Sequence, residues 1–195
     1  TATRFDGFAA AGLSLASTPA SSYTVSLDVN TFYSGYADGR GNPVLGVGLG
    51  FYSSAPTDPG IIKENFNGLV LRANGDLNLV LAGSVAQTFV TTYAQNTNEF
   101  RKLTYTVDTV TGDISDLKFG NVDFLVVNTG ASEAAFQAAN LQYVGFGSNT
   151  QGASYYNSVF VRDFLLTAPI PEPASLSLLS LGMVSALSRR RLRKH

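Results

Sequence analysis

Apolar and polar residues alternate along most of the first 167 positions, and this period of two decides the fold class. From Tyr23 to Asn30, apolar side chains at odd positions alternate with polar side chains at even positions. Successive side chains of a β-strand point to opposite faces, so such a segment buries one face and exposes the other. The pattern predicts nine strands, at residues 23–30, 44–53, 66–72, 76–82, 88–93, 100–108, 114–119, 142–147 and 158–167.

The connections between these segments favour antiparallel pairing. Asn74-Gly75 lies between two apolar runs and predicts a two-residue type I′ turn, because both central residues of that turn need positive φ. Thr111-Gly112-Asp113 predicts a second hairpin. One helix is expected from Glu133 to Asn140, with Ser132 as its N-cap and Glu133 at the positive end of its dipole.

These elements predict an all-β fold: a two-layer antiparallel β-sandwich of the jelly-roll type with one short helix, over residues 1–167. The side chains expected to point inward are Val25, Leu27, Leu79, Tyr105, Val107 and Phe146.

Several of these segments together resemble the concanavalin A-like lectin and glucanase jelly rolls, a class that includes laminin-G-like modules. The resemblance implies a fold in which glycans often bind on a concave sheet or at loop edges. It identifies no ligand. The segments that carry it are Phe66–Arg72, Asp76–Gly83, Leu103–Asp113, Tyr143–Gly147 and Val159–Leu166.

The sequence changes character after Thr167. Residues 168–173 contain three prolines and read as a stiff linker, since proline neither continues a helix nor donates to a strand ladder. Residues 174–195 follow as an apolar run and a basic tail. A helix over residues 174–187 would be about 21 Å long, against a hydrocarbon core about 30 Å thick, so it can span a membrane only marginally. The terminal cations favour the cytoplasmic side, which leaves the body exported.

This order of features closely resembles the PEP-CTERM sorting signal of Gram-negative bacteria. The resemblance implies that an exosortase, an integral-membrane enzyme, recognises Pro171-Glu172-Pro173 and processes the protein. The expected route passes through the inner membrane to the cell surface or an exopolysaccharide matrix. The secretory signal that such export requires is not found in the chain, and we expect it to have been removed. The alternative interpretations of residues 171–195 are a plain stop-transfer anchor and a basic amphipathic tail. The tail cations include Arg189, Arg190 and Arg191.

Composition excludes several classes of function. The chain has no cysteine, which rules out thiol nucleophiles, disulfides and cysteine-ligated metals, and its one histidine is the last residue, His195. Up to Ile170 there are 8 basic and 13 acidic residues. Nucleic acid is therefore not expected as a partner, because neutralisation of phosphates dominates that affinity.

Two aromatic clusters in predicted loops are the candidate glycan-binding residues. Rings stack on sugar faces, and neighbouring amide groups can bind hydroxyls. The alternative is that these rings cover the ends of the core, since tyrosine combines apolar area with one polar group. The first cluster comprises Phe32, Tyr33 and Tyr36; the second comprises Tyr155 and Tyr156, with Asn149, Gln151 and Asn157 beside it.

Two glycine-rich segments are weaker candidates for a binding site than the aromatic clusters. Gly46, Gly48 and Gly50 fall on one face of a predicted strand, where they accommodate bulky neighbours or a ligand. Residues 38–42, Asp-Gly-Arg-Gly-Asn, offer oxygen ligands for calcium but lack the helix-loop-helix pattern, so a solvated turn is favoured and no cofactor is predicted.

Carboxylate catalysis has little support. Glycoside hydrolysis needs two carboxyl groups about 5–9.5 Å apart. The Glu-x-Asp-x-x-Glu type of strand found in lectin-like glucanases is missing, and Glu64, Glu99 and Glu133 stand alone. Asp113 and Asp116 flank a hairpin. The sequence thus favours a non-enzymatic exported domain with a glycan-binding surface over a glycoside hydrolase or a purely structural module.

Overall fold

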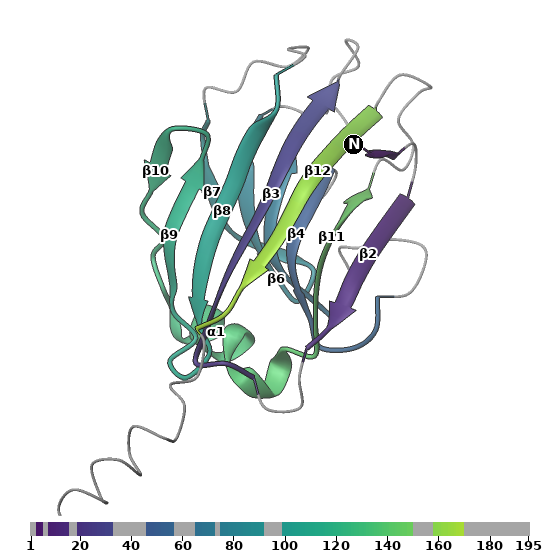
Figure 1. Ribbon diagram of the computed structural model, residues 1–195. Helices are drawn as coiled ribbons and strands as arrows, with labels where there is room; N and C mark the ends of the chain where they lie inside the picture. Colours follow the sequence, from purple (N-terminus) through teal and green to yellow (C-terminus); the bar gives the residue numbers. More distant parts are fainter. Residues whose placement is uncertain are drawn as a thin grey trace, which may run out of the picture.

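The computed structural model describes residues 3–5, 8–15, 19–32, 46–56, 65–72, 75–91, 99–149 and 158–169. These residues form two six-stranded antiparallel sheets packed face to face, which confirms the predicted sandwich (Figure 1). Sheet A has the order β1-β12-β3-β8-β9-β10 and sheet B the order β2-β11-β4-β5-β6-β7. The strands of sheet A are β1 (Thr3–Phe5), β12 (Ser158–Thr167), β3 (Ser22–Phe32), β8 (Arg101–Asp108), β9 (Ile114–Phe119) and β10 (Val122–Phe124). Those of sheet B are β2 (Phe8–Ser14), β11 (Tyr143–Asn149), β4 (Gly46–Tyr52), β5 (Phe66–Arg72), β6 (Leu77–Leu81) and β7 (Ser84–Phe89).

Each of the strands predicted from alternation is present. The pattern did not predict three further strands or the position at which β7 begins. Strand β7 occupies Ser84–Phe89 instead of residues 88–93. Exposure alternates along β7, but polarity does not follow it, because Gln87 takes a half-buried position and Ala86 an exposed one. A register shift also interrupts the pairing with β6 between Leu79 and Val80. The strands that the sequence did not predict are β1, β2 and β10.

The predicted helix is real but begins earlier than expected. Helix α1 spans Gly130–Phe136, and a separate 3₁₀ turn, η1, spans Ala138–Asn140. Thr129 is the N-cap and Ser132 occupies the third helical position, so the assignment of Ser132 as N-cap was wrong. The two side chains form a reciprocal capping box, in which the Ser132 hydroxyl accepts from the Thr129 N–H at 2.8 Å. Glu133 lies in the first turn, as predicted.

The two-residue turn lies in a different hairpin from the one predicted. In the β5–β6 connection, the Arg72 N–H donates to the Asp76 carbonyl and the Gly75 N–H to the Arg72 carbonyl, so three residues separate the closing pair. The β6–β7 connection is the two-residue one: Ala82 and Gly83 have φ of 47° and 76°. Alanine tolerates this conformation here because the Ala82 N–H donates to the buried Asn67 side chain at 2.8 Å.

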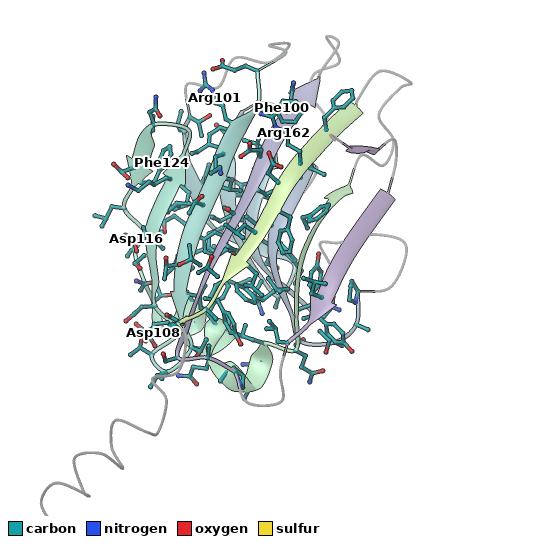
Figure 2. All side chains as sticks on the ribbon, viewed as in Figure 1. Phe100, Arg101, Asp108, Asp116, Phe124 and Arg162 are labelled. Carbon is teal, nitrogen blue, oxygen red and sulfur yellow. The ribbon has the colours of Figure 1, made fainter. Side chains whose placement is uncertain are left out.

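Sheet A contains two bulges at aspartates with left-handed backbone. Asp116 in β9 and Asp163 in β12 have φ of 52° and 53°, and the register of their strands shifts at these points. Aspartate adopts this conformation more readily than most residues. The bulges bend their strands locally and leave both aspartates exposed on the outside of the sandwich, where Asp116 is seen beside β9 (Figure 2).

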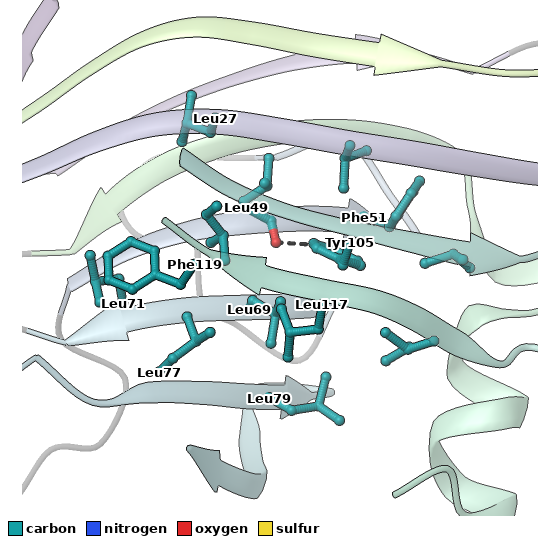
Figure 3. Packing of buried hydrophobic residues seen from close by; sticks show 14 of the residues in the cluster. Leu27, Leu49, Phe51, Leu69, Leu71, Leu77, Leu79, Tyr105, Leu117 and Phe119 are labelled. Carbon is teal, nitrogen blue, oxygen red and sulfur yellow. Dashed lines mark hydrogen bonds between the residues drawn. The ribbon is translucent and has the colours of Figure 1, made fainter. Parts of the chain in front are cut away.

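The core lies between the two sheets (Figure 3). Five of the six side chains predicted to point inward are buried, while Phe146 is half-buried at the rim, where its ring lies 5.3 Å from that of Phe164. Exchanging a fully buried leucine such as Leu27 for alanine costs about 2–5 kcal/mol. Neither helix in the described part of the chain is long and apolar enough to cross a membrane, and the predicted apolar tail helix at 174–190 lies outside that part.

Candidate functional site

The two loops that carry the predicted aromatic clusters leave the sandwich at the same end. Strand β3 ends at Phe32, which pairs with Ser158, the first residue of β12. Strand β11 ends at Asn149, which pairs with Gly46, the first residue of β4. Residues 33–45 therefore connect β3 of sheet A to β4 of sheet B, and residues 150–157 connect β11 of sheet B to β12 of sheet A. We call this the loop end; α1 lies at the opposite end (Figure 1).

Most of the candidate glycan-binding residues lie outside the described residues. Asn149 is placed by its backbone pairing with Gly46 on one side and Phe8 on the other. The remaining candidates, Tyr33, Tyr36, Tyr155, Tyr156 and Asn157, belong to the segments that join these strand ends. The strand pairing thus fixes where both segments are attached, and their interaction with a glycan stays a prediction.

A polar cluster lies on the outer face of sheet A, in the half of β3 that leads to the loop end. Asp28 lies on β3, and its carboxylate is 3.4 Å from Nε of Arg162 and 3.7 Å from Nζ of Lys102. The Arg162 guanidinium also stacks on the Phe100 ring, 4.1 Å from its centroid (Figure 2). We call Asp28, Lys102, Phe100 and Arg162 the Asp28 cluster. Sequence analysis missed it because its members come from three strand regions far apart in the chain.

The Asp28 cluster has a fixed geometry. The Asp28 side chain is only 14% exposed, and Arg162 is also 3.6 Å from the Asp163 carboxylate. The bulge at Asp163 places these two neighbours on β12 so that Arg162 faces Asp28 across the ladder. A guanidinium held by two carboxylates and one ring has few free rotamers, so the cluster is preorganised.

Asn30 lies on the same face of β3, two positions nearer the loop end. It is 5% exposed, and its Oδ1 accepts no hydrogen bond from the described residues. A buried acceptor without a partner costs about 1–3 kcal/mol. Asn30 thus contributes a buried amide oxygen, without a described hydrogen-bond partner, on the loop-end side of Asp28.

The glycine face of β4 accommodates a ring of its own sheet. The residues of β4 that alternate with these glycines, Val47, Leu49 and Phe51, lie in the core as predicted. On the outer face, a Cβ on Gly50 would come within 2.8 Å of the Phe66 ring. A Cβ on Gly68, which pairs with Gly50, would come within 2.9 Å of the same ring. At Gly50 the expected bulky neighbour is therefore present, although it comes from the adjacent strand of the same sheet and not from a neighbouring layer.

Phe66 belongs to a second apolar cluster on this outer face, formed with Tyr52, Val70 and Val80. All four side chains are buried. Burial raises the pKa of the Tyr52 phenol, so its hydroxyl stays protonated at any ordinary pH. The cluster thus contributes apolar packing and no charge.

Two of the described carboxylates, those of Asp108 and Asp113, accept hydrogen bonds within the turn between β8 and β9. The Asp108 carboxylate accepts backbone hydrogen bonds from Thr111 at 2.9 Å and from Val110 at 2.8 Å. These two bonds lower the pKa of Asp108, so it is unsuited to act as a general acid. Asp113 accepts a hydrogen bond from the exposed Thr111 hydroxyl. Within the described residues, no three acidic or histidine side chains gather where a metal could bind; residues 38–42 and Glu64 lie outside them.

Comparison with known proteins adds two findings. Residues 169–194 match the family model of the PEP-CTERM protein-sorting motif, and none of the curated proteins matches the chain. The carbohydrate recognition domain of Emp46p, in its metal-free form, has a TM-score of 0.53 and 13% identity over 82% of this chain and 76% of that one. Its potassium-bound form has a TM-score of 0.53 and 12% identity over 77% of this chain and 73% of that one. The carbohydrate recognition domain of Emp47p has a TM-score of 0.52 and 16% identity over 82% of this chain and 75% of that one.

The fold and the tail together define a lectin-like β-sandwich domain that carries a C-terminal sorting signal. At these identities the structural similarity shows the fold alone. The signal itself is the PEP-CTERM motif, which confirms the resemblance seen in the sequence. The motif marks an exported protein sorted by an exosortase.

Proposed function

We propose that this chain is a non-enzymatic domain that binds a polysaccharide at its loop end and is held at the cell surface or in an exopolysaccharide matrix. The observation that carries the proposal is the pairing of Phe32 with Ser158 and of Asn149 with Gly46. These pairs attach both aromatic segments to one end of a lectin-like fold. The residues proposed to bind glycan are Tyr33, Tyr36, Asn149, Tyr155, Tyr156 and Asn157.

The described residues support a polar, sugar-compatible surface beside these segments. Asn30 offers a buried amide acceptor, and the Asp28 cluster supplies a rigid ion pair with an aromatic ring. Amide groups, carboxylates and rings are the groups that recognise hydroxyls and the apolar faces of sugars. Neither a cofactor nor a metal enters this proposal.

The sorting motif lies very close to the folded body. Thr167 still pairs with Thr24, and Ala168 packs against the core. Five residues lie between Ala168 and Ala174, where the apolar run begins, so the six residue steps span at most about 20 Å. We infer that the sandwich lies against the outer surface of the inner membrane of a Gram-negative bacterium until an exosortase acts on the tail.

The test is retention on an insoluble polysaccharide. In the variant Tyr155→Ala, Tyr156→Ala, each lost ring removes on the order of 1–3 kcal/mol of apolar burial, which weakens binding about five- to 150-fold. Retention should be lost while the unfolding midpoint changes little. The matched control is Leu125→Ala, Val127→Ala, which removes two exposed side chains, 86% and 61% exposed, from the segment between β10 and α1.

The outcomes separate the proposal from a purely structural module. Retention of the wild type and the control, without retention of the tyrosine variant, supports the glycan site. Retention of the tyrosine variant overturns it. Unfolding of the variant at the working temperature would mean that the rings belong to the core, which favours the structural module.

A further inference from the structure

A cavity of about 440 Å³ lies at the end of the sandwich opposite the loop end. Its walls come from the end of β2, the 3₁₀ turn η1 and the start of β11, beside α1 (Figure 1). The residues that matter for its chemistry are Ser14, Pro19, Ala139, Leu141, Gln142 and Tyr143.

Backbone hydrogen bonds hold the walls of this cavity in place. The Leu15 N–H donates to the Gln142 carbonyl at 2.8 Å, and the Gln142 N–H donates to the Tyr52 carbonyl at 3.0 Å. Tyr143 pairs with Ser14 on one side and with Tyr52 on the other. The cavity therefore exists before any ligand arrives, and binding costs little ordering of the backbone.

The third wall, η1, is fixed from both sides. The Ala138 N–H donates to the Thr109 carbonyl at 2.9 Å, which ties the turn to the end of β8. The Asn140 side chain donates to the Ala134 carbonyl of α1 at 2.8 Å. Ala139, between them, is exposed on the cavity side of the turn.

The lining decides the class of ligand. None of the described residues that line the cavity carries a charge, so an anionic or cationic ligand would lose hydration without gaining an ion pair. The Ser14 hydroxyl, the Gln142 amide and the Tyr143 phenol offer donors and acceptors, while Pro19, Leu141 and Ala139 offer apolar surface. This mixture suits a neutral molecule with several hydroxyls and an apolar face.

We propose that this cavity binds one or two units of a neutral saccharide. Its volume lies within the range of about 300–1,000 Å³ that is typical of small-molecule sites. The site is independent of the proposed loop-end site. If the proposed function also holds, the domain has glycan sites at both ends and joins two polysaccharide chains.

The test is saturation-transfer difference NMR on the full 195-residue chain, with cellobiose and maltose as neutral probes and glucose 1-phosphate as the charged probe. A neutral disaccharide should receive saturation and the phosphate should not. Ala139→Trp, which fills the cavity from an exposed position, should weaken binding at least about tenfold. Gln142→Leu, which keeps the backbone bonds and removes the amide, should weaken it about five- to tenfold.

Two controls distinguish this site from the loop end. Ala86→Trp adds the same ring at an exposed position on β7 and should leave the transfer unchanged. Tyr155→Ala, Tyr156→Ala should also leave it unchanged, even if that variant loses retention on insoluble polysaccharide. The proposal is overturned if neither neutral probe receives saturation, if Ala139→Trp and Gln142→Leu both bind as the wild type does, or if only the tyrosine variant loses the transfer.

Discussion

The Tyr105 hydroxyl donates a hydrogen bond of 3.0 Å to the backbone carbonyl of Leu49, and this bond joins sheet A to sheet B through the middle of the core (Figure 3). Both side chains are fully buried. Burial raises the pKa of the Tyr105 phenol well above its ordinary value, and the nearby Tyr52 raises it further. The hydroxyl is therefore always protonated and available as a donor to Leu49.

Removing this one oxygen should destabilise the fold. Tyr105→Phe leaves the Leu49 carbonyl without its inter-sheet donor, which is expected to lower the free energy of unfolding by about 1–2 kcal/mol in urea titrations. Tyr52→Phe is the matched control, because the buried Tyr52 hydroxyl has no hydrogen-bond partner among the described residues. That change should leave stability equal or raise it by up to about 1 kcal/mol. Equal losses in both variants would contradict the inter-sheet role of Tyr105.

Gly112 shows how the β8–β9 hairpin depends on α1. It has φ of +84°, and a Cβ at this position would lie 1.8 Å from the Glu133 carbonyl oxygen. Gly112→Ala should therefore lower the free energy of unfolding by at least about 2 kcal/mol, because the cost of the backbone strain is added to that of the clash with the helix backbone. Gly120→Ala is the control: its φ is +63°, but the nearest atom would be 3.5 Å away, in the Arg101 side chain. Its cost should stay near 1 kcal/mol, about that of the left-handed conformation alone. Thermal unfolding of the two variants measures the difference, and similar shifts would contradict the close approach.

The sequence predicts the central strands of sheet A well because one face of β3 and of β8 is buried and the other is polar. In sheet B, β4, β5 and β6 are buried on both faces, and their short apolar runs bounded by turn residues identify them instead. Strand β2 was not predicted because its sequence, Phe-Ala-Ala-Ala-Gly-Leu-Ser, has small residues on both faces. Strand β10 was not predicted because it is only three residues long. The helix start was misplaced because Thr129 and Ser132 are both good N-caps, and only the tertiary position of the segment selects Thr129.

The candidate sites were predictable to a smaller extent. The Pro171-Glu172-Pro173 signal is contiguous, so the residues alone identify it. The Asp28–Arg162 pair and the cavity at Gln142 bring together residues that are far apart in the chain. No local pattern encodes such contacts, because they depend on strand order and on the bulge at Asp163.

Stability at low pH should depend on Asp108. Because its folded-state pKa lies below the ordinary value of about 3.9, the charged form stabilises the hairpin above that pH. This contribution is lost as the pH falls through the lowered pKa. Asp108→Asn should therefore be less stable than the wild type at pH 7, and the difference in unfolding midpoint should disappear toward pH 2. Asp123→Asn, which breaks only the exposed pair with Lys118, is the control and should have a small effect that salt reduces. A difference for Asp108→Asn that persists unchanged at pH 2 would contradict the role of its charge.

The sorting motif and the folded body should be separable by mutation. Thr167 makes the last strand pair and Ala168 the last described core contact, so replacing Pro171, Glu172 and Pro173 by alanine removes none of the described contacts of the sandwich. The unfolding midpoint of the variant should equal that of the wild type. Its maturation should be blocked, because the motif that the exosortase is expected to recognise is gone. The measurement is the ratio of membrane-retained to released protein on immunoblots of fractionated cells that export the chain.

Replacing Ser175, Ser177 and Ser180 by alanine keeps the motif and makes the following run more apolar, so this control should still be processed. If the triple-alanine variant is released like the wild type, the motif does not direct the sorting of this chain, and the tail acts as an ordinary anchor.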